Sequence, residues 1–306
     1  MLQRWMFLLW SSLILWAVSE RIFWSFWRPD ENIFAVLLTV WMYLLATYAS
    51  LLTLEYFRVS SLWGLMLVGA LYGWITEGII AMTVFWLWGI PFPISLSWTA
   101  LAWHMPLSVL IFWWYHYKAL TQSFKKSLLL SIGLWIFWWL WSMTWFFEDV
   151  PLITTLPSYA LHAGVVTLAI MWGHVFISFS QVQTFISPKG EKITLLGMIG
   201  LFFVFVTLPT VWYSILVLPL LAWIIYWGLR FEKKKYTQSG ILKDFWNKIS
   251  YLNLSTLFLT PVIATGIYGL ILSETLPIFP INMIFFPFSS LVWLILFIYA
   301  LRKISR

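Results

Sequence analysis

Two ionisable residues lie in the middle of long apolar segments, and both are of types that carry protons. Glu77 lies in GALYGWITEGIIA (69–81), and His104 lies in SWTALAWHMPL (97–107). A carboxylate that loses its water can take up a proton, and an imidazole can relay one near neutral pH. Charged groups at such positions are costly unless they face other protein groups. The pair therefore favours proton-linked chemistry, provided that its two segments meet.

The spacing around the turn GIPFP (89–93) predicts that they do. Glu77 lies 13 residues before Ile90, and His104 lies 13 residues after Pro91, so antiparallel helices would carry both at one depth. Small side chains permit close helix contact. They lie one helical turn from each of the two residues: Gly73 and Ala81 beside Glu77, and Ala100 and Ser108 beside His104.

A third candidate, His162, lies five residues after Pro157, near the start of a later apolar segment that begins on the same side. Glu148 and Asp149 precede that segment, so most titratable groups gather in one half of the protein. The leading hypothesis is a substrate and proton site formed by Glu77, His104 and His162, which requires no cofactor. The alternative without a site is that these groups bond to Trp, Ser and backbone atoms and only fix the packing.

A metal or haem site is a further hypothesis, since a carboxylate and imidazoles are suitable ligands for haem b or a divalent ion. Two pairs of histidines are each 12 residues apart, a pattern similar to that of di-haem b-type membrane cytochromes. At about 100° per residue, however, 12 residues turn the two side chains of one helix about 120° apart. The residues of this alternative are Glu77, His104, His116, His162 and His174.

The composition excludes an ordinary soluble protein and makes the lipid bilayer the first partner. Of the 306 residues, 62% are hydrophobic and 9% are charged, and 25 are Trp. The net charge of +7 is spread over short loops, which indicates membrane topology and not binding of nucleic acid. Cys is absent, which excludes thiolate metal ligands and Cys nucleophiles.

Apolar runs long enough to cross a membrane predict an all-α, polytopic helical bundle with about ten transmembrane helices, in a single domain (1–306). A broken segment around 207–210 would reduce the number to nine. The first run lacks a small-residue cleavage site, so we expect it to be a retained helix. The expected spans are 5–26, 33–54, 61–85, 95–116, 127–147, 156–180, 193–208, 211–229, 254–273 and 281–301.

Lys and Arg follow the fourth, sixth, eighth and tenth spans, and none lies in the loops after the third, fifth, seventh and ninth. This alternation predicts that the N and C termini are both cytoplasmic, with the chain in the cytoplasmic membrane of the cell. Arg21 and Arg28 are the exception on the outer side. We expect Glu20 and Arg21 to begin the first outer loop.

The cytoplasmic basic loop 231–252 contains the segment YTQSGILKDFWNKIS (236–250), whose apolar residues recur at helical spacing. This pattern predicts one amphipathic helix that rests on the membrane surface or, alternatively, docks a cytoplasmic partner.

The function favoured by these observations is transport of a small molecule, with proton coupling through Glu77. Ten spans in 306 residues with both termini inside are similar in layout to the drug/metabolite transporter superfamily, although its glycine-rich helix patterns are absent. Two alternatives stay open. One is a membrane-embedded enzyme or redox protein that uses the same Glu/His cluster, and the other is a non-catalytic accessory subunit of a larger membrane complex. A homo-oligomer is compatible with each.

Overall fold

The computed structural model describes residues 1–28, 31–85, 94–147, 153–278 and 281–306, with side chains from residue 284 onward in the last range. It is 82% helical, and the described residues contain no strand. Ten of its helices are long and apolar enough to cross a membrane. The prediction of an all-α, multi-pass membrane bundle is therefore confirmed, and the segments on either side of 211 form two separate spans.

Several spans change their winding along their length, so one span often has more than one label. The spans are α1 (Leu2–Trp16) with the π-helix η1 (Ala17–Ile22); α2 (Ile33–Tyr56); α3 (Leu62–Ile75) with the π-helix η2 (Thr76–Ile80); η3 (Ile94–Leu96), the π-helix η4 (Ala100–Tyr115) and α4 (His116–Gln122); α5 (Phe124–Ser142) with η5 (Met143–Phe147); α6 (Leu156–Ser180); α7 (Lys189–Phe202), the π-helix η6 (Phe203–Thr207) and α8 (Leu208–Thr210); α9 (Ser214–Lys235); α11 (Tyr251–Ser255), η7 (Thr256–Phe258) and α12 (Leu259–Leu272); and α13 (Ile281–Ser305).

Helix starts are fixed by side chains that accept hydrogen bonds from the free N–H groups of the first turn. Asn32 accepts from Ala35 N ahead of α2, and Ser61 accepts from Gly64 N ahead of α3. Thr155 caps α6, with Pro157 in the first turn, where a missing N–H is harmless. These short polar residues place the helix boundaries within a chain that is otherwise apolar.

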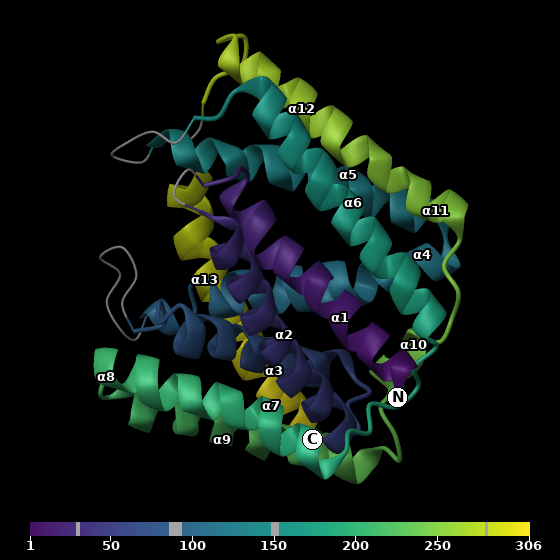
Figure 1. Cartoon of the computed structure of the whole chain (residues 1–306), viewed down its shortest axis with the longest axis vertical. Helices are drawn as coiled ribbons and strands as arrows, with labels where there is room; N and C mark the ends of the chain where they lie inside the picture. The colour runs from purple at the N-terminus through teal and green to yellow at the C-terminus, as the bar shows by residue number, and fades with distance from the viewer. Residues whose placement is uncertain (29–30, 86–93, 148–152, 279–280) are drawn as a thin grey trace.

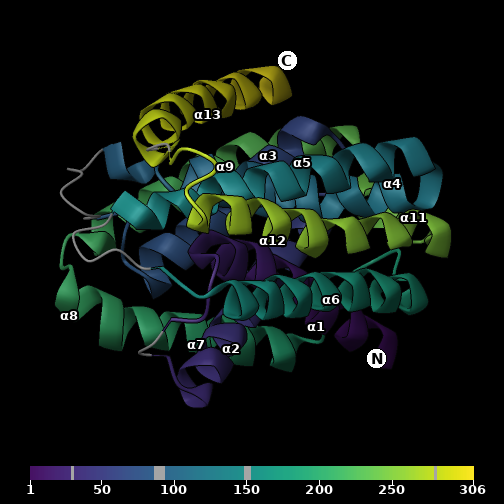
Figure 2. The same cartoon turned by 90° about the horizontal axis from the view of Figure 1, so that it is seen from above.

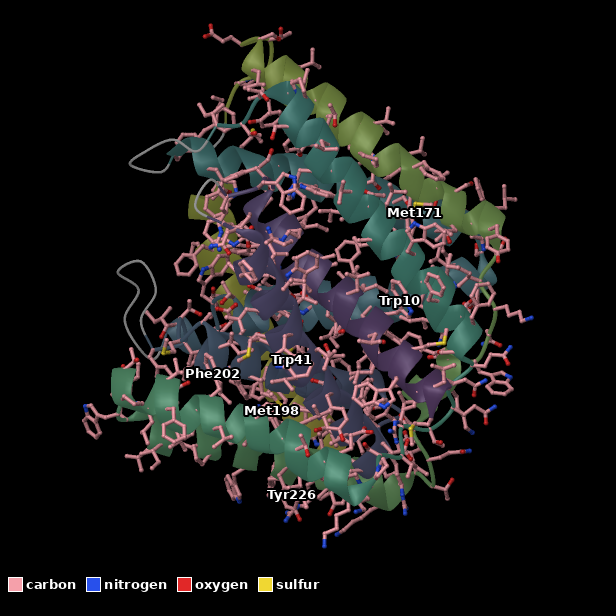
Figure 3. All side chains as sticks on the ribbon, in the orientation of Figure 1. Trp10, Trp41, Met171, Met198, Phe202 and Tyr226 are labelled. Atoms are coloured by element: carbon pink, nitrogen blue, oxygen red, sulfur yellow. The ribbon has the colours of Figure 1, made fainter. Side chains whose placement is uncertain are left out.

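The centre of the bundle is formed by α1, α3 and η4. In Figure 1, α1 crosses the middle of the molecule, and its main neighbours are α2 and α6. Figure 2 shows the N-terminus and α8 at opposite ends of the bundle. In the most apolar 18-residue stretch of each span, 78% of the residues are buried for the third and fourth spans, against 11% for the seventh. The third and fourth spans are therefore the core pair, and α7 faces outward.

The close packing of α3 on η4 depends on glycine. A Cβ on Gly73 would collide with the carbonyl oxygen of Ala100, and one on Gly69 would lie 3.1 Å from the Cα of Met105. Larger residues at either position would force the two backbones apart. The small residues around Glu77 and His104 therefore do permit the close approach that the sequence predicts.

Three central spans adopt π winding where they carry polar residues: η1, η2 and η4. In η4 the His104 N–H donates to the carbonyl oxygen of Thr99 at 2.9 Å, five residues back, and Thr99 itself has a φ of 52°. A π-helix has more than four residues per turn, and such turns are frequent at functional sites. The sequence argument that His104 and His116 lie about 120° apart assumed ideal α geometry, so it does not hold across 100–115.

The segment 236–250 contains a shorter helix than predicted, α10 (Gly240–Asp244), which Ser239 caps. Its apolar side chains are buried in the protein and do not rest on lipid: Ile241, Leu242 and Phe245 are at most 2% exposed. The Tyr117 hydroxyl donates to the carbonyl oxygens of Phe245 and Asn247 and so holds the chain after α10 in a non-helical form. Trp246 stays exposed.

Candidate functional site

Glu77 in η2 and His104 in η4 form a buried hydrogen-bonded pair. The Nε2 atom of His104 lies 2.5 Å from Oε1 of Glu77, and the two residues are 1% and 9% exposed. Such a short contact between an imidazole and a carboxyl group leaves one proton between them, on the ring nitrogen or on the oxygen. The structure thus brings together two of the three residues of the leading hypothesis.

The second ring nitrogen of His104 is held by a chain of hydroxyl groups from η1, η4 and α3. Nδ1 of His104 lies 3.0 Å from the Oγ of Ser19. That oxygen lies 2.9 Å from the Oγ of Ser108 and 3.4 Å from the hydroxyl of Tyr72. Both ring nitrogens of His104 therefore have partners, and the orientation of the ring is fixed from three helices.

A second carboxylate, Glu20, lies in η1 close to the pair. Its Oε1 accepts a hydrogen bond of 2.7 Å from the Tyr43 hydroxyl, and its Oε2 accepts one of 3.2 Å from Nε1 of Trp24. Glu20 and Glu77 are close enough to interact electrostatically. The remaining oxygen of Glu77, Oε2, accepts from the Thr83 hydroxyl.

These groups line one cavity of about 170 Å³. Because a water molecule takes about 30 Å³ in the liquid, the cavity holds a few waters or one small solute. Its wall combines two carboxylates, an imidazole and a guanidinium with hydroxyl groups and aromatic rings. The lining residues are Ser19, Glu20, Phe23, Trp24, Arg28, Glu77, Ala81, Thr83, Thr99 and His104.

Arg21 does not begin a loop, as we expected from the sequence, but lies buried in the last turn of the first span. Its guanidinium makes two hydrogen bonds of 2.5 Å to the two carboxylate oxygens of Glu31. Both side chains are at most 2% exposed. A bidentate pair of this kind has the best geometry for a buried ion pair, and it ties the end of η1 to the start of α2.

His162 in α6 lies apart from the cavity and supports η1 from behind. Its Nε2 donates a hydrogen bond of 2.9 Å to the carbonyl oxygen of Arg21, and its ring packs edge-on against Trp27 at 4.8 Å. It has no described contact with Glu77 or His104. Glu148, Asp149 and the turn 86–93, which were part of the sequence argument, lie outside the described residues.

His116 in α4 and His174 in α6 form a second histidine pair in the other half of the bundle. Their ring centres are 5.1 Å apart at an interplanar angle of 81°, and both rings are fully buried. None of their four ring nitrogens has a hydrogen-bond partner among the described residues. Rings in direct contact leave no space for a porphyrin between them, so this pair does not fit two haem ligands.

The metal hypothesis also meets a geometric obstacle. Within the described ranges, no three side chains of the His, Cys, Asp and Glu types lie close enough to hold an ion together. Glu77 and His104 are engaged with each other, while His162 and the pair His116–His174 lie elsewhere.

Several residues of the cavity network were not identified from the sequence, among them Ser19, Glu20, Tyr43 and Tyr72. The polar run Ser19-Glu20-Arg21 within an otherwise apolar segment is the signal that could have found the first two. Tyr43 and Tyr72 carry no such signal, because tyrosine is common throughout membrane spans.

Comparison of the chain with models of protein families, with curated proteins and with solved structures gave no match.

Proposed function

We propose that this multi-pass membrane protein is a proton-linked transporter of a small molecule, with Glu77 and His104 as the proton-binding pair. The observation that carries the proposal is the contact of 2.5 Å between these two side chains at the wall of a cavity that also contains Glu20. His162 has a positioning role in this proposal, since it bonds to the backbone of the turn that carries Ser19 and Glu20.

The charges around the pair explain how a proton would be linked to a solute. Glu20 and Arg28 line the same cavity. Tyr43 is hydrogen-bonded to Glu20, and Tyr72 lies 3.4 Å from the Ser19 hydroxyl, so each tyrosine is connected to the cavity by one lining residue. Binding or loss of one proton at the pair changes the net charge of this small space by one unit. Because buried charges interact strongly, the affinity for a charged solute changes with it.

The cavity lies in the half of the bundle remote from the N-terminus. Arg28 in its wall is about one-third exposed, which supports entry of a solute from that side. A solute that enters the cavity there lies against Trp24, Glu20 and the pair, which all line it. Transport then requires a second arrangement of the helices that opens the opposite side. The π turns in η1, η2 and η4 are local departures from α winding at which such helices can change shape.

The test uses the purified full chain in liposomes that contain a pH-sensitive dye. A panel of small amines, sugars and amino acids is added outside, and proton movement is followed. We expect proton movement with at least one class of solute, and we expect Glu77→Gln and His104→Gln to abolish it. Glu274→Gln is the matched control, because Glu274 is exposed and distant in sequence from the cavity. Unchanged proton movement in Glu77→Gln would contradict the proposal.

A second candidate function is supported by one specific observation, the chain Ser19–His104–Glu77. The Ser19 hydroxyl lies 3.0 Å from one imidazole nitrogen, and the carboxylate holds the other. A hydroxyl beside a base that is oriented by a carboxylate is the arrangement of a serine nucleophile. In that reaction the Ser19 oxygen would attack an ester carbonyl, its proton would pass to His104, and the alcohol would leave with that proton.

The two candidates differ in what they require of Ser19. A fluorophosphonate probe should label a serine nucleophile, and the adduct should be lost in Ser19→Ala. In a transporter, Ser19→Ala keeps proton movement, because the contact between Glu77 and His104 stays intact. Absence of the adduct from wild-type protein would exclude the second candidate.

A further inference from the structure

Trp24 presents one of its faces to a cation. Its ring is stacked on Trp145, with ring centres 4.7 Å apart at an interplanar angle of 20°. The guanidinium carbon of Arg28 lies over the Trp24 ring at 4.9 Å. Trp24 is therefore in contact with both an aromatic ring and a cation. An indole face attracts cations more strongly than the other aromatic side chains do.

Arg28 is held loosely in this place. Among the described residues its ion-pair partner is Glu31, at 3.6 Å, and that carboxylate already makes two hydrogen bonds of 2.5 Å to Arg21. The Nε atom of Arg28 is buried and has no hydrogen-bond partner among the described residues. With its side chain also about one-third exposed, Arg28 can leave the cavity without breaking a strong ion pair.

The wall of the same cavity carries two acidic residues. Glu20 is held in place by Tyr43 and by the edge of the Trp24 ring, and Glu77 lies beside His104. Carboxylates fixed around an aromatic face are complementary to a compact organic cation. A cavity of about 170 Å³ has room for a head group of the size of guanidinium or a small amine, and not for a drug-sized molecule.

We propose that the substrate class is a small organic cation, a protonated amine or guanidine, which binds on the Trp24 face in the place where Arg28 lies. Arg28 is then a tethered competitor, whose displacement by the solute opens the cavity. That the cation is a transported substrate depends on the proposed function, whereas the binding of the cation does not. Cation binding at this place explains why a guanidinium lies in this cavity with a buried Nε atom that has no hydrogen-bond partner in the described part of the chain.

Equilibrium dialysis of radiolabelled guanidinium against the purified full chain in detergent tests this inference. The wild-type protein should bind the ion weakly. Removal of the tethered competitor in Arg28→Gln should raise the affinity about tenfold, since a tethered group competes at a high effective concentration. Arg28→Lys, which keeps a tethered cation, should bind as weakly as the wild type. Glu20→Gln, combined with Arg28→Gln, should remove most of the gain.

Two matched controls separate specific binding from general attraction. Arg230 also lies over a tryptophan, Trp227, at 5.3 Å, but outside the cavity, so Arg230→Gln should not change the affinity. Urea has the shape of guanidinium without its charge and should not compete. Equal affinity in Arg28→Gln and wild type, or competition by urea, would overturn the inference.

The outcome is independent of the liposome test of transport. Guanidinium binding that depends on Arg28 and Glu20, without any proton movement, would support the cation site and contradict the transporter. Proton movement driven only by neutral solutes, with no guanidinium binding, would contradict the cation site and support the transporter.

Discussion

The two buried histidines of the fourth span have opposite surroundings. His104 is bonded at both ring nitrogens, to Glu77 and to Ser19, and it borders a cavity. His116, twelve residues later, is packed among rings, with His174 at 5.1 Å and Phe112 at 6.2 Å, and it has no hydrogen-bond partner among the described residues. Both are fully buried, so burial alone does not distinguish a candidate site from a packing position.

The difference lies in which neighbours each half of the bundle supplies. Around His104, η1 and η2 contribute carboxylates and hydroxyls that can exchange a proton with the ring. Around His116, Phe112 and His174 contribute aromatic surface, and the hydroxyl of the adjacent Tyr117 is directed to backbone carbonyls. The first half therefore surrounds its histidine with ionisable and hydroxyl groups, and the second surrounds its histidine with aromatic rings next to the 236–250 segment.

The largest effect is expected from Glu77→Ala. The substitution leaves His104 without its acceptor and opens a space in the core, and removal of one partner of a buried ionic pair costs about 3–5 kcal/mol. Glu77→Gln keeps the shape and an acceptor oxygen, so it should cost about 1 kcal/mol. Thermal unfolding of both variants in detergent measures the difference. Equal unfolding temperatures for the two would show that the pair has no energetic role.

Replacement of histidine by phenylalanine should have opposite effects at His104 and at the His116–His174 pair. His104→Phe leaves the Glu77 carboxylate buried without its partner, and we expect a loss of about 2–3 kcal/mol. The double variant His116→Phe, His174→Phe removes only nitrogens without partners, and we expect no change or a gain of about 1 kcal/mol. Unfolding in detergent again provides the measurement. Strong destabilisation of the double variant would mean that His116 and His174 do bind a polar group.

A smaller effect is expected from Tyr43→Phe, which removes the hydrogen bond of 2.7 Å to Glu20. A hydrogen bond to a charged group contributes about 1.5–3 kcal/mol, and the nearby Trp24 bond should compensate for part of it. Guanidinium affinity in the Arg28→Gln background should fall as well, because Glu20 becomes less fixed. Tyr48→Phe, at a tyrosine bonded to Ser187 away from the cavity, is the control for affinity.

The smallest effect is expected from Ser108→Ala. It deletes one of the two hydroxyl neighbours of Ser19, at 2.9 Å, and should cost about 1 kcal/mol or less. Proton movement should continue at a similar rate, since the contact between Glu77 and His104 does not involve Ser108. Complete loss of activity in this variant would instead assign the hydroxyl chain to the proton path.

The sequence predicts the helical class and the spans well, because length and hydropathy are local properties and a bilayer permits few other structures. The approach of Glu77 to His104 followed from counting outward from one turn, since the two residues are on consecutive spans. Depth alone does not give the direction in which a helix face points, so His162, at a similar predicted depth, lies behind η1 instead of in the cavity.

The contribution of the first span could not be derived in the same way. Ser19 and Glu20 meet η4 and α2 through tertiary packing, and Arg21 seemed to mark a loop because its partner Glu31 lies in the following segment. The π winding was also missed, since the pattern of apolar residues in 100–115 does not distinguish a π-helix from an α-helix when nearly every position is apolar.

The π winding of η4 has a consequence for how this chain can tolerate insertions and deletions. Loss of one residue between His104 and His116 would turn everything after the gap by slightly less than a quarter of a turn, since a π-helix has more than four residues per turn. A deletion of this kind would leave the composition and hydropathy of the span almost unchanged. It would nevertheless rotate His116 away from His174 and Tyr117 away from the carbonyls of Phe245 and Asn247. The length of this segment, to the single residue, is therefore a strict requirement, even where the residue types are not.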